Sequence, residues 1–261
     1  MTDTPDERLQ IRNLTVGFGT HIVQRGLSFS VRQGSIFAIM GGSGCGKSTV
    51  LRAMIGLLRP MTGTVVVDGE DYWAASEERR AAIAHRFGVL FQSGALWSSM
   101  TVAENVALPL QMLTDLDASG IAILVDLKLS FVGLAAAAGK MPTELSGGMR
   151  KRAALARALA LDPEILFFDE PSAGLDPITS NRLDDLILEL SKGLGATVVI
   201  VSHELPSLFA ICDDGIFLDA GTRTAIAHGS PRALRQQCEH PAVRAFMERG
   251  QAGSGGPGGA Q

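Results

Sequence analysis

The sequence predicts an α/β fold built on a mainly parallel core sheet. Short apolar runs typical of buried strands alternate with longer stretches of helical periodicity along most of the 261 residues, a pattern typical of parallel sheets. Two of the apolar runs, 35–40 and 165–168, lead directly into residues that can bind a phosphate or a cation, and parallel sheets bind their ligands at that edge. A chain of this length suffices for one large domain, or for one domain with an inserted subdomain.

The first quarter of the chain contains four predicted strands and one helix. Alternation of apolar and polar residues predicts strands at 9–16 and 27–31. The apolar run 35–40 predicts a buried strand, which is followed by a glycine-rich turn and an amphipathic helix over 47–58. Residues 64–68 then predict an edge strand.

From residue 74 to residue 141 the pattern is mostly helical, which predicts a helical subdomain inserted at about 93–160. One short strand, 87–91, interrupts it. After this stretch the alternation of strands and helices returns. The expected elements are, in order, helices at 76–86, 102–113, 119–132 and 146–161, a strand at 165–169, a helix at 179–192, a strand at 197–202, a helix at 205–211, a hairpin over 216–228 and terminal helices over 231–249.

Composition and charge exclude several classes of protein. The net charge is −4, from 23 basic and 27 acidic residues, whereas a nucleic-acid binder would be basic; we therefore expect no nucleic-acid partner. Hydrophobic residues make up 46% of the chain, which excludes disorder over most of it, yet no run approaches the ~18 apolar residues of a membrane-spanning helix. Met1–Gln10 is polar and acidic, so we expect no signal peptide. The three widely spaced cysteines, Cys45, Cys212 and Cys238, indicate neither disulfides nor a zinc site.

A phosphate-binding loop is predicted between the strand 35–40 and the helix that follows it. Residues 41–49 match the pattern GxxxxGK[ST], whose glycines let successive backbone N–H groups face one anion at the positive end of a helix. Lys47 can bridge the β- and γ-phosphates, Ser48 can ligate Mg²⁺, and Thr49 can bind a more distal phosphate oxygen. The alternative to a phosphate-binding loop is a glycine-rich left-handed turn before a helix. Such a turn would not require Lys47 or the hydroxyl groups of Ser48 and Thr49. The predicted binding residues are Gly41, Gly42, Ser43, Gly44, Cys45, Gly46, Lys47, Ser48 and Thr49.

Two carboxylates follow a second buried strand. Residues 165–168 are apolar and lead into Asp169 and Glu170. Asp169 is suited to hold the water shell of Mg²⁺, and Glu170 to polarise an attacking water. An exposed strand end would explain the pair equally well if it stood alone. Together with the phosphate-binding loop, the pair predicts a protein that binds and hydrolyses a nucleoside triphosphate.

A second anion site is predicted at the start of the helix after Leu145. Ser146 can cap this helix, and Gly147 and Gly148 leave its first backbone N–H groups open to a ligand. A chain with two half-sites for phosphate is expected to form a head-to-tail dimer, in which each copy completes the site of the other. The alternative is an ordinary capped helix with a solvated basic turn at 149–152.

The order of these motifs resembles that of the ATP-binding cassette (ABC) ATPases. The sequence LSGGM at 145–149 resembles the signature motif of that family, which binds the nucleotide of the partner subunit. By the same resemblance, Gln92 corresponds to the Q-loop glutamine near Mg²⁺ and the attacking water, Asp176 to the D-loop aspartate at the dimer interface, and His203 to the switch histidine near the γ-phosphate. The implied signature residues are Ser146, Gly147, Gly148 and Met149.

Phe18 lies near the position at which the family places an aromatic ring, usually a tyrosine, against adenine. A phenylalanine keeps the π-face of the tyrosine and loses its hydroxyl. The alternative for Phe18 is a core residue at the end of a strand. The alternative for His203 is a histidine that packs in the core or caps a helix. The resemblance implies ATP and Mg²⁺ as cofactors. The implied catalytic residues are Glu170, His203 and Gln92, and those at the metal are Ser48, Gln92 and Asp169.

The resemblance covers about residues 9–229 and implies the fold of a P-loop NTPase, with a mainly parallel core sheet, an antiparallel β subdomain and an inserted α-helical subdomain. We expect the ATPase domain at 7–229. A helical extension at 230–249 is expected either to reach across the dimer or to pack on its own domain. The remaining segment, 250–261, is predicted to be a disordered glycine-rich tail.

Three segments, 91–97, 144–149 and 176–179, are similar to the cassettes of MCE-type lipid transporters, above all those of the Mla system, which maintains outer-membrane lipid asymmetry. Many importer cassettes have Gln where this chain has Met149, and the lipid branch often has Phe in place of Trp97. The resemblance implies a peripheral ATPase on the cytoplasmic face of the bacterial inner membrane that powers phospholipid transport. The implied partners are a second cassette subunit in a homodimer, an integral-membrane permease, an MCE-domain lipid-binding protein and a small accessory subunit.

Two other functions fit the same motifs. An ABC ATPase that imports a small solute, such as an amino acid, would carry them all. A soluble ABC clamp in DNA repair or translation is disfavoured, because repair clamps have a very long coiled coil between the two anion motifs and translation-type proteins have two cassettes per chain. The apolar stretch 96–113 predicts a cradle for a permease loop or, equally, an amphipathic core helix.

Overall fold

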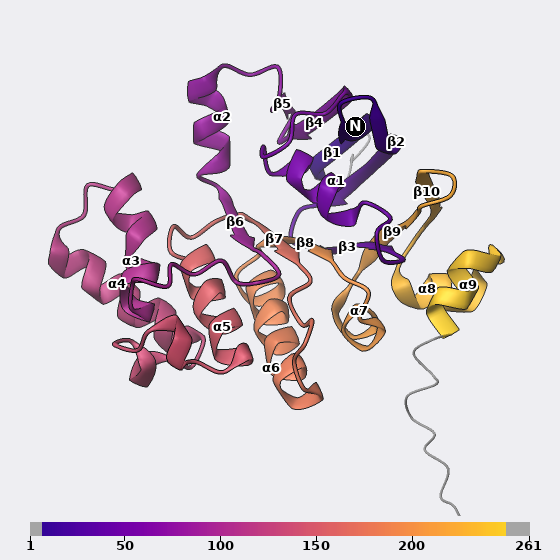
Figure 1. Cartoon of the computed structure of the whole chain (residues 1–261). Helices are drawn as coiled ribbons and strands as arrows, with labels where there is room; N and C mark the ends of the chain where they lie inside the picture. Colours follow the sequence, from indigo (N-terminus) through magenta and orange to yellow (C-terminus); the bar gives the residue numbers. More distant parts are fainter. Residues whose placement is uncertain (1–6, 249–261) are drawn as a thin grey trace, which may run out of the picture.

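A six-stranded sheet forms the centre of the computed structural model, which describes residues 7–248 (Figure 1). Its strands are β3 (Ile36–Gly41), β6 (Phe87–Leu90), β7 (Ile165–Asp169), β8 (Thr197–Val201), β9 (Asp214–Asp219) and β10 (Thr224–His228). They lie in the order β10-β9-β3-β8-β7-β6, and every neighbouring pair except β9 and β10 is parallel. The prediction of a mainly parallel core sheet is therefore confirmed.

The second sheet is antiparallel. It is formed by β1 (Glu7–Phe18), β2 (His21–Arg32), β4 (Thr62–Val67) and the short β5 (Glu70–Asp71), in the order β2-β1-β4-β5. The strand expected at the edge, β4, is thus an inner strand covered by β5. The sequence did not predict β5, because two residues carry no periodicity.

Helix α1 (Lys47–Met54) lies between the two sheets and packs against β1 of one sheet and β3, β7 and β8 of the other. It ends before the expected residue 58, because the chain turns at Gly56, where φ is 83°. A Cβ at this position would approach the hydroxyl oxygen of Tyr72 to 2.1 Å. Only glycine fits this turn without displacing Tyr72.

Side chains of the central strands alternate between two hydrophobic clusters, one on each face of the six-stranded sheet. Phe37 and Ile39 of β3 belong to the cluster shared with α1 and the antiparallel sheet. Ala38 and Met40 belong to the cluster shared with the helices on the other face. Because both faces are covered, the central strands are apolar along most of their length.

Helices α3 (Val102–Leu113), α4 (Ala118–Phe131) and α5 (Gly147–Ala158) connect β6 to β7 and pack against one another. Two short 3₁₀ turns, Ala135–Ala137 and Pro142–Glu144, join α4 to α5. Figure 1 shows α3 and α4 to one side of the sheet, beyond α5, while α2 (Glu77–Ala84) precedes β6. The boundaries of the helical subdomain, about 93 and 160, stay a prediction.

The last part of the chain returns to the sheet and ends in two helices that pack on their own chain. The ring of Phe246 in α9 lies edge-on to that of Phe217 in β9, with the ring centres 5.0 Å apart. The predicted tail 250–261 lies outside the described residues. None of the helices within residues 7–248 is long and apolar enough to cross a membrane. The helices after β7 are α6 (Pro177–Leu188), a π-helical turn (Glu189–Gly193), α7 (Leu205–Ile211), α8 (Pro231–Gln237) and α9 (Pro241–Glu248).

Candidate functional site

The predicted phosphate-binding loop, 41–49, lies between the end of β3 and the start of α1, and two of its glycines permit its path. Gly41 has a φ of 147°, and a Cβ there would approach the carbonyl oxygen of Leu218 to 2.5 Å. Gly46 has a φ of 98°, and a Cβ there would approach Cγ1 of Val23 to 2.4 Å. A larger residue at either position would displace the loop.

Lys47 directs its ammonium group back into this loop. Its Nζ donates hydrogen bonds to the carbonyl oxygens of Gly41 and Gly42, both at 3.0 Å, and the residue is buried. The ammonium and the positive end of α1 therefore face the same space, which is suited to a polyphosphate. The hydroxyl of the next residue, Ser48, donates to Oδ1 of Asp169 at 2.8 Å.

Gln24 of β2 holds the loop in place from within the core. Its Nε2 donates to the carbonyl oxygens of Cys45, at 2.6 Å, and of Asp219, at 3.1 Å. The side chain is fully buried, so these bonds are shielded from water. Gln24 was not predicted from the sequence; the available signal was a polar residue at an inward position of a strand. Burial also raises the pKa of the Cys45 thiol, which keeps it protonated.

Asp169 ends the buried strand β7 and Glu170 follows it, as predicted from the apolar run before them. Burial raises the pKa of Asp169 above its usual range, and the hydrogen bond from Ser48 acts against that rise. Glu170 has a φ of 52°, in the left-handed region that a non-glycine residue rarely adopts. Its Oε1 lies 2.8 Å from Nδ1 of His203, and its Oε2 is buried without a hydrogen-bond partner among residues 7–248.

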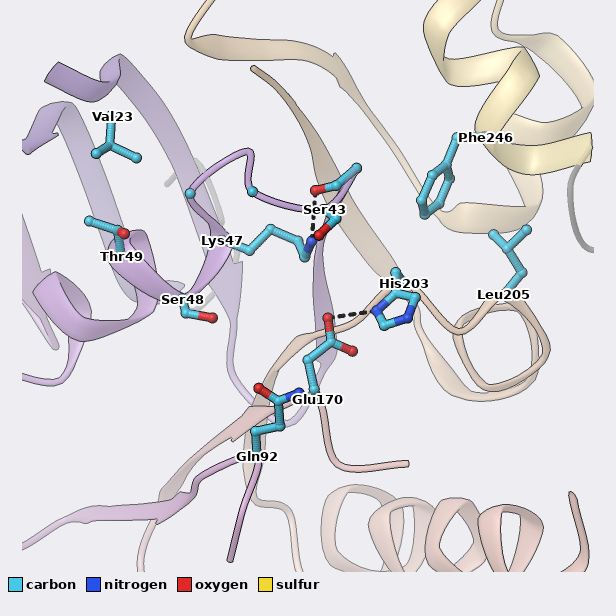
Figure 2. A pocket seen from close by; sticks show the side chains of 13 residues that line it. Val23, Ser43, Lys47, Ser48, Thr49, Gln92, Glu170, His203, Leu205 and Phe246 are labelled. Atoms are coloured by element: carbon cyan, nitrogen blue, oxygen red, sulfur yellow. Dashed lines mark hydrogen bonds and ion pairs between the residues drawn. The ribbon is translucent and has the colours of Figure 1, made fainter. Parts of the chain in front are cut away.

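Glu170, His203 and the phosphate-binding loop face a cavity of about 700 Å³ (Figure 2). Gln92, which follows β6, points toward Glu170, and His203 lies on the other side of that carboxylate. Predicted residues that line the cavity are Gly42, Ser43, Gly44, Gly46, Lys47, Ser48, Thr49, Gln92, Glu170 and His203. Apolar walls that the sequence did not predict come from Val23, Leu205 and Phe246; the last of these residues lies in α9, far along the chain.

The remaining predicted residues do not line this cavity. Phe18 is 53% exposed at the end of β1. Ser146 caps α5 by accepting a hydrogen bond from the N–H of Met149 at 3.2 Å, and Ser146 and Gly147 are exposed, whereas Gly148 is buried. Asp176 caps α6 through the N–H groups of residues 178 and 179. The roles predicted for Ser146–Met149 and Asp176 require a second copy of the chain, and the role predicted for Phe18 requires a bound nucleotide; all of them stay predictions.

Lys151 links the helix that starts at Ser146 to the end of β7. Its Nζ donates to the carbonyl oxygens of Glu170, at 3.0 Å, and Ala173, at 2.7 Å. The residue is buried, and desolvation lowers the pKa of its ammonium. The alternative that residues 149–152 form a solvated basic turn is therefore wrong for Lys151.

The donors around Ser48 fit a magnesium ion. The Ser48 hydroxyl and the Asp169 carboxylate lie within hydrogen-bond distance of each other, and Gln92 adds an amide oxygen at the same cavity. A site with few oxygen ligands from the protein suits Mg²⁺, because this ion usually keeps several water ligands and binds together with the phosphates of a substrate. The described residues include no cluster of three or more His, Cys, Asp or Glu that could hold a metal without such a substrate.

Comparison with known proteins places this site in a family. Residues 24–173 match the model of the family described as ABC transporter. The chain is 44% identical over 240 residues to the intermembrane phospholipid transport system ATP-binding protein MlaF of Escherichia coli (strain K12), covering 92% of this chain and 88% of that protein. This chain belongs to the ABC transporter family. The resemblance seen in its motifs is thereby confirmed.

Two further ABC proteins extend the comparison. The probable ribonucleotide transport ATP-binding protein mkl of Mycobacterium bovis is 38% identical over 92% of this chain and 66% of that protein. The dimeric structure of the ATP-binding cassette MJ0796, in a post-hydrolysis state bound to ADP and Pi, matches with a TM-score of 0.76 at 29% identity, covering 84% of this chain and 97% of that chain. The predicted P-loop NTPase fold is confirmed by this match.

Proposed function

We propose that this ABC protein hydrolyses ATP in the presence of Mg²⁺ and that the reaction drives transport of phospholipid through a membrane permease. The observation that carries the proposal is the convergence of Lys47, Gln92, Glu170 and His203 on one cavity. A polyphosphate there would meet a lysine, loop N–H groups, a buried carboxylate and a histidine, and phosphoryl transfer requires groups of these kinds.

Binding of ATP would use the groups that now bond to one another within the loop. Phosphate oxygens would take the place of the Gly41 and Gly42 carbonyls as acceptors for Lys47, with the N-terminus of α1 adding its dipole. Mg²⁺, when bound, supplies positive charge that stabilises the phosphate oxygens. The residues that would hold it are Ser48, Gln92 and Asp169.

Glu170 would polarise the attacking water. The imidazole of His203 holds Oε1 of its carboxylate at 2.8 Å, which leaves the buried Oε2 as the acceptor for the proton of the water. On the other side of the carboxylate, Gln92 would contact the same water and the metal. His203 would also contact the γ-phosphate, which it can do while the Glu170 contact fixes its ring.

A second copy of the chain would complete the site. The predicted signature residues, Ser146–Met149, do not line the cavity of their own chain, and Ser146 and Gly147 are exposed at the N-terminus of α5. We infer that this helix end binds the triphosphate held by a partner subunit, in a homodimer whose interface includes Asp176. The dimeric form of MJ0796 supports this arrangement.

The proposed cargo rests on MlaF, whose name assigns it to an intermembrane phospholipid transport system. By this similarity the chain would act as a peripheral subunit on the cytoplasmic face of the inner membrane. Its partners would be a permease, an MCE-domain lipid-binding protein and a small accessory subunit. The similarity to mkl favours a second candidate, transport of a small solute.

The test is to purify the tagged chain from its native membranes in mild detergent and to identify what accompanies it. We expect a multi-spanning permease, a single-span MCE protein, bound phospholipid and ATPase activity that requires Mg²⁺. A solute-binding protein in place of the MCE protein would favour the second candidate. Recovery of the chain without any permease would overturn the transport function altogether.

A further inference from the structure

A second, much smaller cavity lies behind the two loops that carry Glu170 and His203. It has room for the centre of one water molecule, about 10 Å³, which is close to the smallest cavity that binds water. Its walls include Ser172, two residues after Glu170, and Ser202, directly before His203. The other walls are formed by Pro171, by Ile200 of β8, by residues of α6 and α7, and by Cys212 after α7. No described residue lines both this cavity and the larger one.

The Ser172 hydroxyl faces this cavity without a hydrogen-bond partner. Ser172 is 1% exposed, and its Oγ bonds to no other residue in the described part of the chain. A buried hydroxyl that lacks a partner costs about 1–3 kcal/mol. A small polar ligand in the cavity would remove that cost.

Asp184 of α6 forms a second polar wall. It is 6% exposed and accepts a hydrogen bond from Ser207 of α7, whose hydroxyl oxygen lies 3.3 Å from that of Ser180. A carboxyl group has about four acceptor positions, so one hydroxyl leaves most of them open. Asp184 and Ser172 therefore offer an acceptor and a donor to one small molecule between them.

The charges around the cavity select the ligand. The charged groups that act on Asp184 are Asp185 on its own helix and Glu204 before α7, both acidic. Burial raises the pKa of the Cys212 thiol in the cavity wall, and the charges of Asp213 and Asp184 add to that rise. This acidic surrounding would repel an anion. A cation such as Mg²⁺ requires about six oxygen ligands, more than a cavity of this size can supply. Water is the ligand that fits.

We propose that this cavity binds one ordered water, which joins the Ser172 hydroxyl to the Asp184 carboxyl, and that Asp184 is thereby a positioning residue for the loops carrying Glu170 and His203. The water would accept from Ser172 and donate to Asp184, while Ser207 joins Asp184 to α7. The loop that carries Glu170 is then connected to α6 through the water, and the loop that carries His203 is connected to α6 through α7. These connections would keep Glu170 and His203 at their distance of 2.8 Å.

A crystal structure at about 1.5 Å resolution tests the water directly. We expect a density peak within about 2.7–3.0 Å of both Ser172 Oγ and an Asp184 carboxyl oxygen, and its loss in Ser172→Ala. A cavity without density in the unaltered protein would overturn the proposal. This measurement does not depend on the proposed ATPase activity, so it decides the water even if the protein proves not to hydrolyse ATP.

The positioning role rests on the proposed function and is tested by kinetics. Asp184→Leu and Ser172→Ala should each lower kcat about tenfold with KM for ATP little changed, because a small displacement of Glu170 affects the chemical step. Asp184→Asn, which keeps the shape and can still accept from both partners, should restore kcat to within about twofold. The matched control is Asp185→Asn, the same change at an exposed neighbour on α6.

Measurements of folding on the same variants show whether a lower kcat results only from unfolding. Each should retain a cooperative thermal transition and bind ATP, and Ser172→Ala removes only one atom if Asp184→Leu fails to fold. If Ser172→Ala folds and hydrolyses ATP with unaltered kcat, the positioning role is wrong. If Asp184→Asn is as slow as Asp184→Leu, the charge of Asp184 and not its bond to the water is what the reaction requires, which likewise overturns the proposal.

Discussion

The carboxylate of Glu170 contacts the imidazole of His203 at 2.8 Å and so joins the ends of two neighbouring parallel strands, β7 and β8. Glu170 has a φ of 52°, a conformation that costs a non-glycine residue about 1–3 kcal/mol. The conformation is held from both sides, because its N–H also donates to the carbonyl oxygen of Val201 at 2.8 Å. The backbone thus fixes the carboxylate before any substrate arrives.

We predict that Glu170→Gln binds ATP but does not turn it over. The amide keeps the size of the side chain and cannot accept a proton, and loss of a general base lowers turnover by about 10²- to 10⁴-fold. ATP would then persist between two copies, so size-exclusion chromatography with ATP should show a dimer. Turnover near that of the unaltered protein would remove Glu170 as the base.

Lys47→Ala should weaken nucleotide binding itself. Each hydrogen bond from a charged donor is worth about 1.5–3 kcal/mol, so we expect the Kd for ATP to rise by at least about tenfold. Lys192→Ala is the control, because Lys192 pairs with Asp213 at the opposite end of β3. Equal ATP affinity of Lys47→Ala and the unaltered protein, measured by calorimetry, would contradict the assigned role.

Lys151→Met should lower both stability and turnover. It removes two buried hydrogen bonds, to the carbonyl oxygens of Glu170 and Ala173, and we expect the free energy of unfolding to fall by about 2–4 kcal/mol. Lys128→Met is the control: Lys128 is also buried, but its partner is the exposed Asp162. In urea denaturation both variants should be less stable, and only Lys151→Met should lower kcat. Equal kcat values in the two variants would show that the Lys151 contact is structural alone.

The local motifs predicted most of the cavity, since they encode backbone geometry over a few residues. The glycines of 41–46, the apolar run before Asp169 and the strand before His203 are each readable within one short window. Gln24 was missed because its partners, Cys45 and Asp219, are brought to it by the fold.

Other differences have the same origin. Lys151 was grouped with its charged neighbours, and only the packing of α5 against the end of β7 shows that it is buried. Phe246 lies more than forty residues after His203 and reaches the same cavity because α9 folds back onto β9. Neither contact has a periodic pattern in the sequence, so neither could be predicted from it.

Asp184 makes stability depend on pH in a predictable direction. Burial raises the pKa of its carboxyl to about 6, from an ordinary value of 3.8, so the folded chain binds this proton more tightly than the unfolded chain does. The resulting stabilisation is present below pH ~4, is lost as the pH rises through ~6, and amounts to about 3 kcal/mol. Asp184→Asn does not titrate and should avoid this loss.

Urea denaturation at pH 4.5 and pH 8 measures this difference. Relative to the unaltered protein, Asp184→Asn should gain about 2 kcal/mol of stability between the two pH values, because part of the loss has already occurred at pH 4.5, above the ordinary pKa of 3.8. Asp185→Asn should reduce the pH dependence only slightly, because Asp185 is exposed and its charge raises the pKa of Asp184 less than burial does. Since Asn still offers an acceptor to the small cavity, the stabilised variant should also keep its turnover. Parallel stability profiles for Asp184→Asn and the unaltered protein would mean that Asp184 titrates as an ordinary surface carboxyl, in contradiction to its burial.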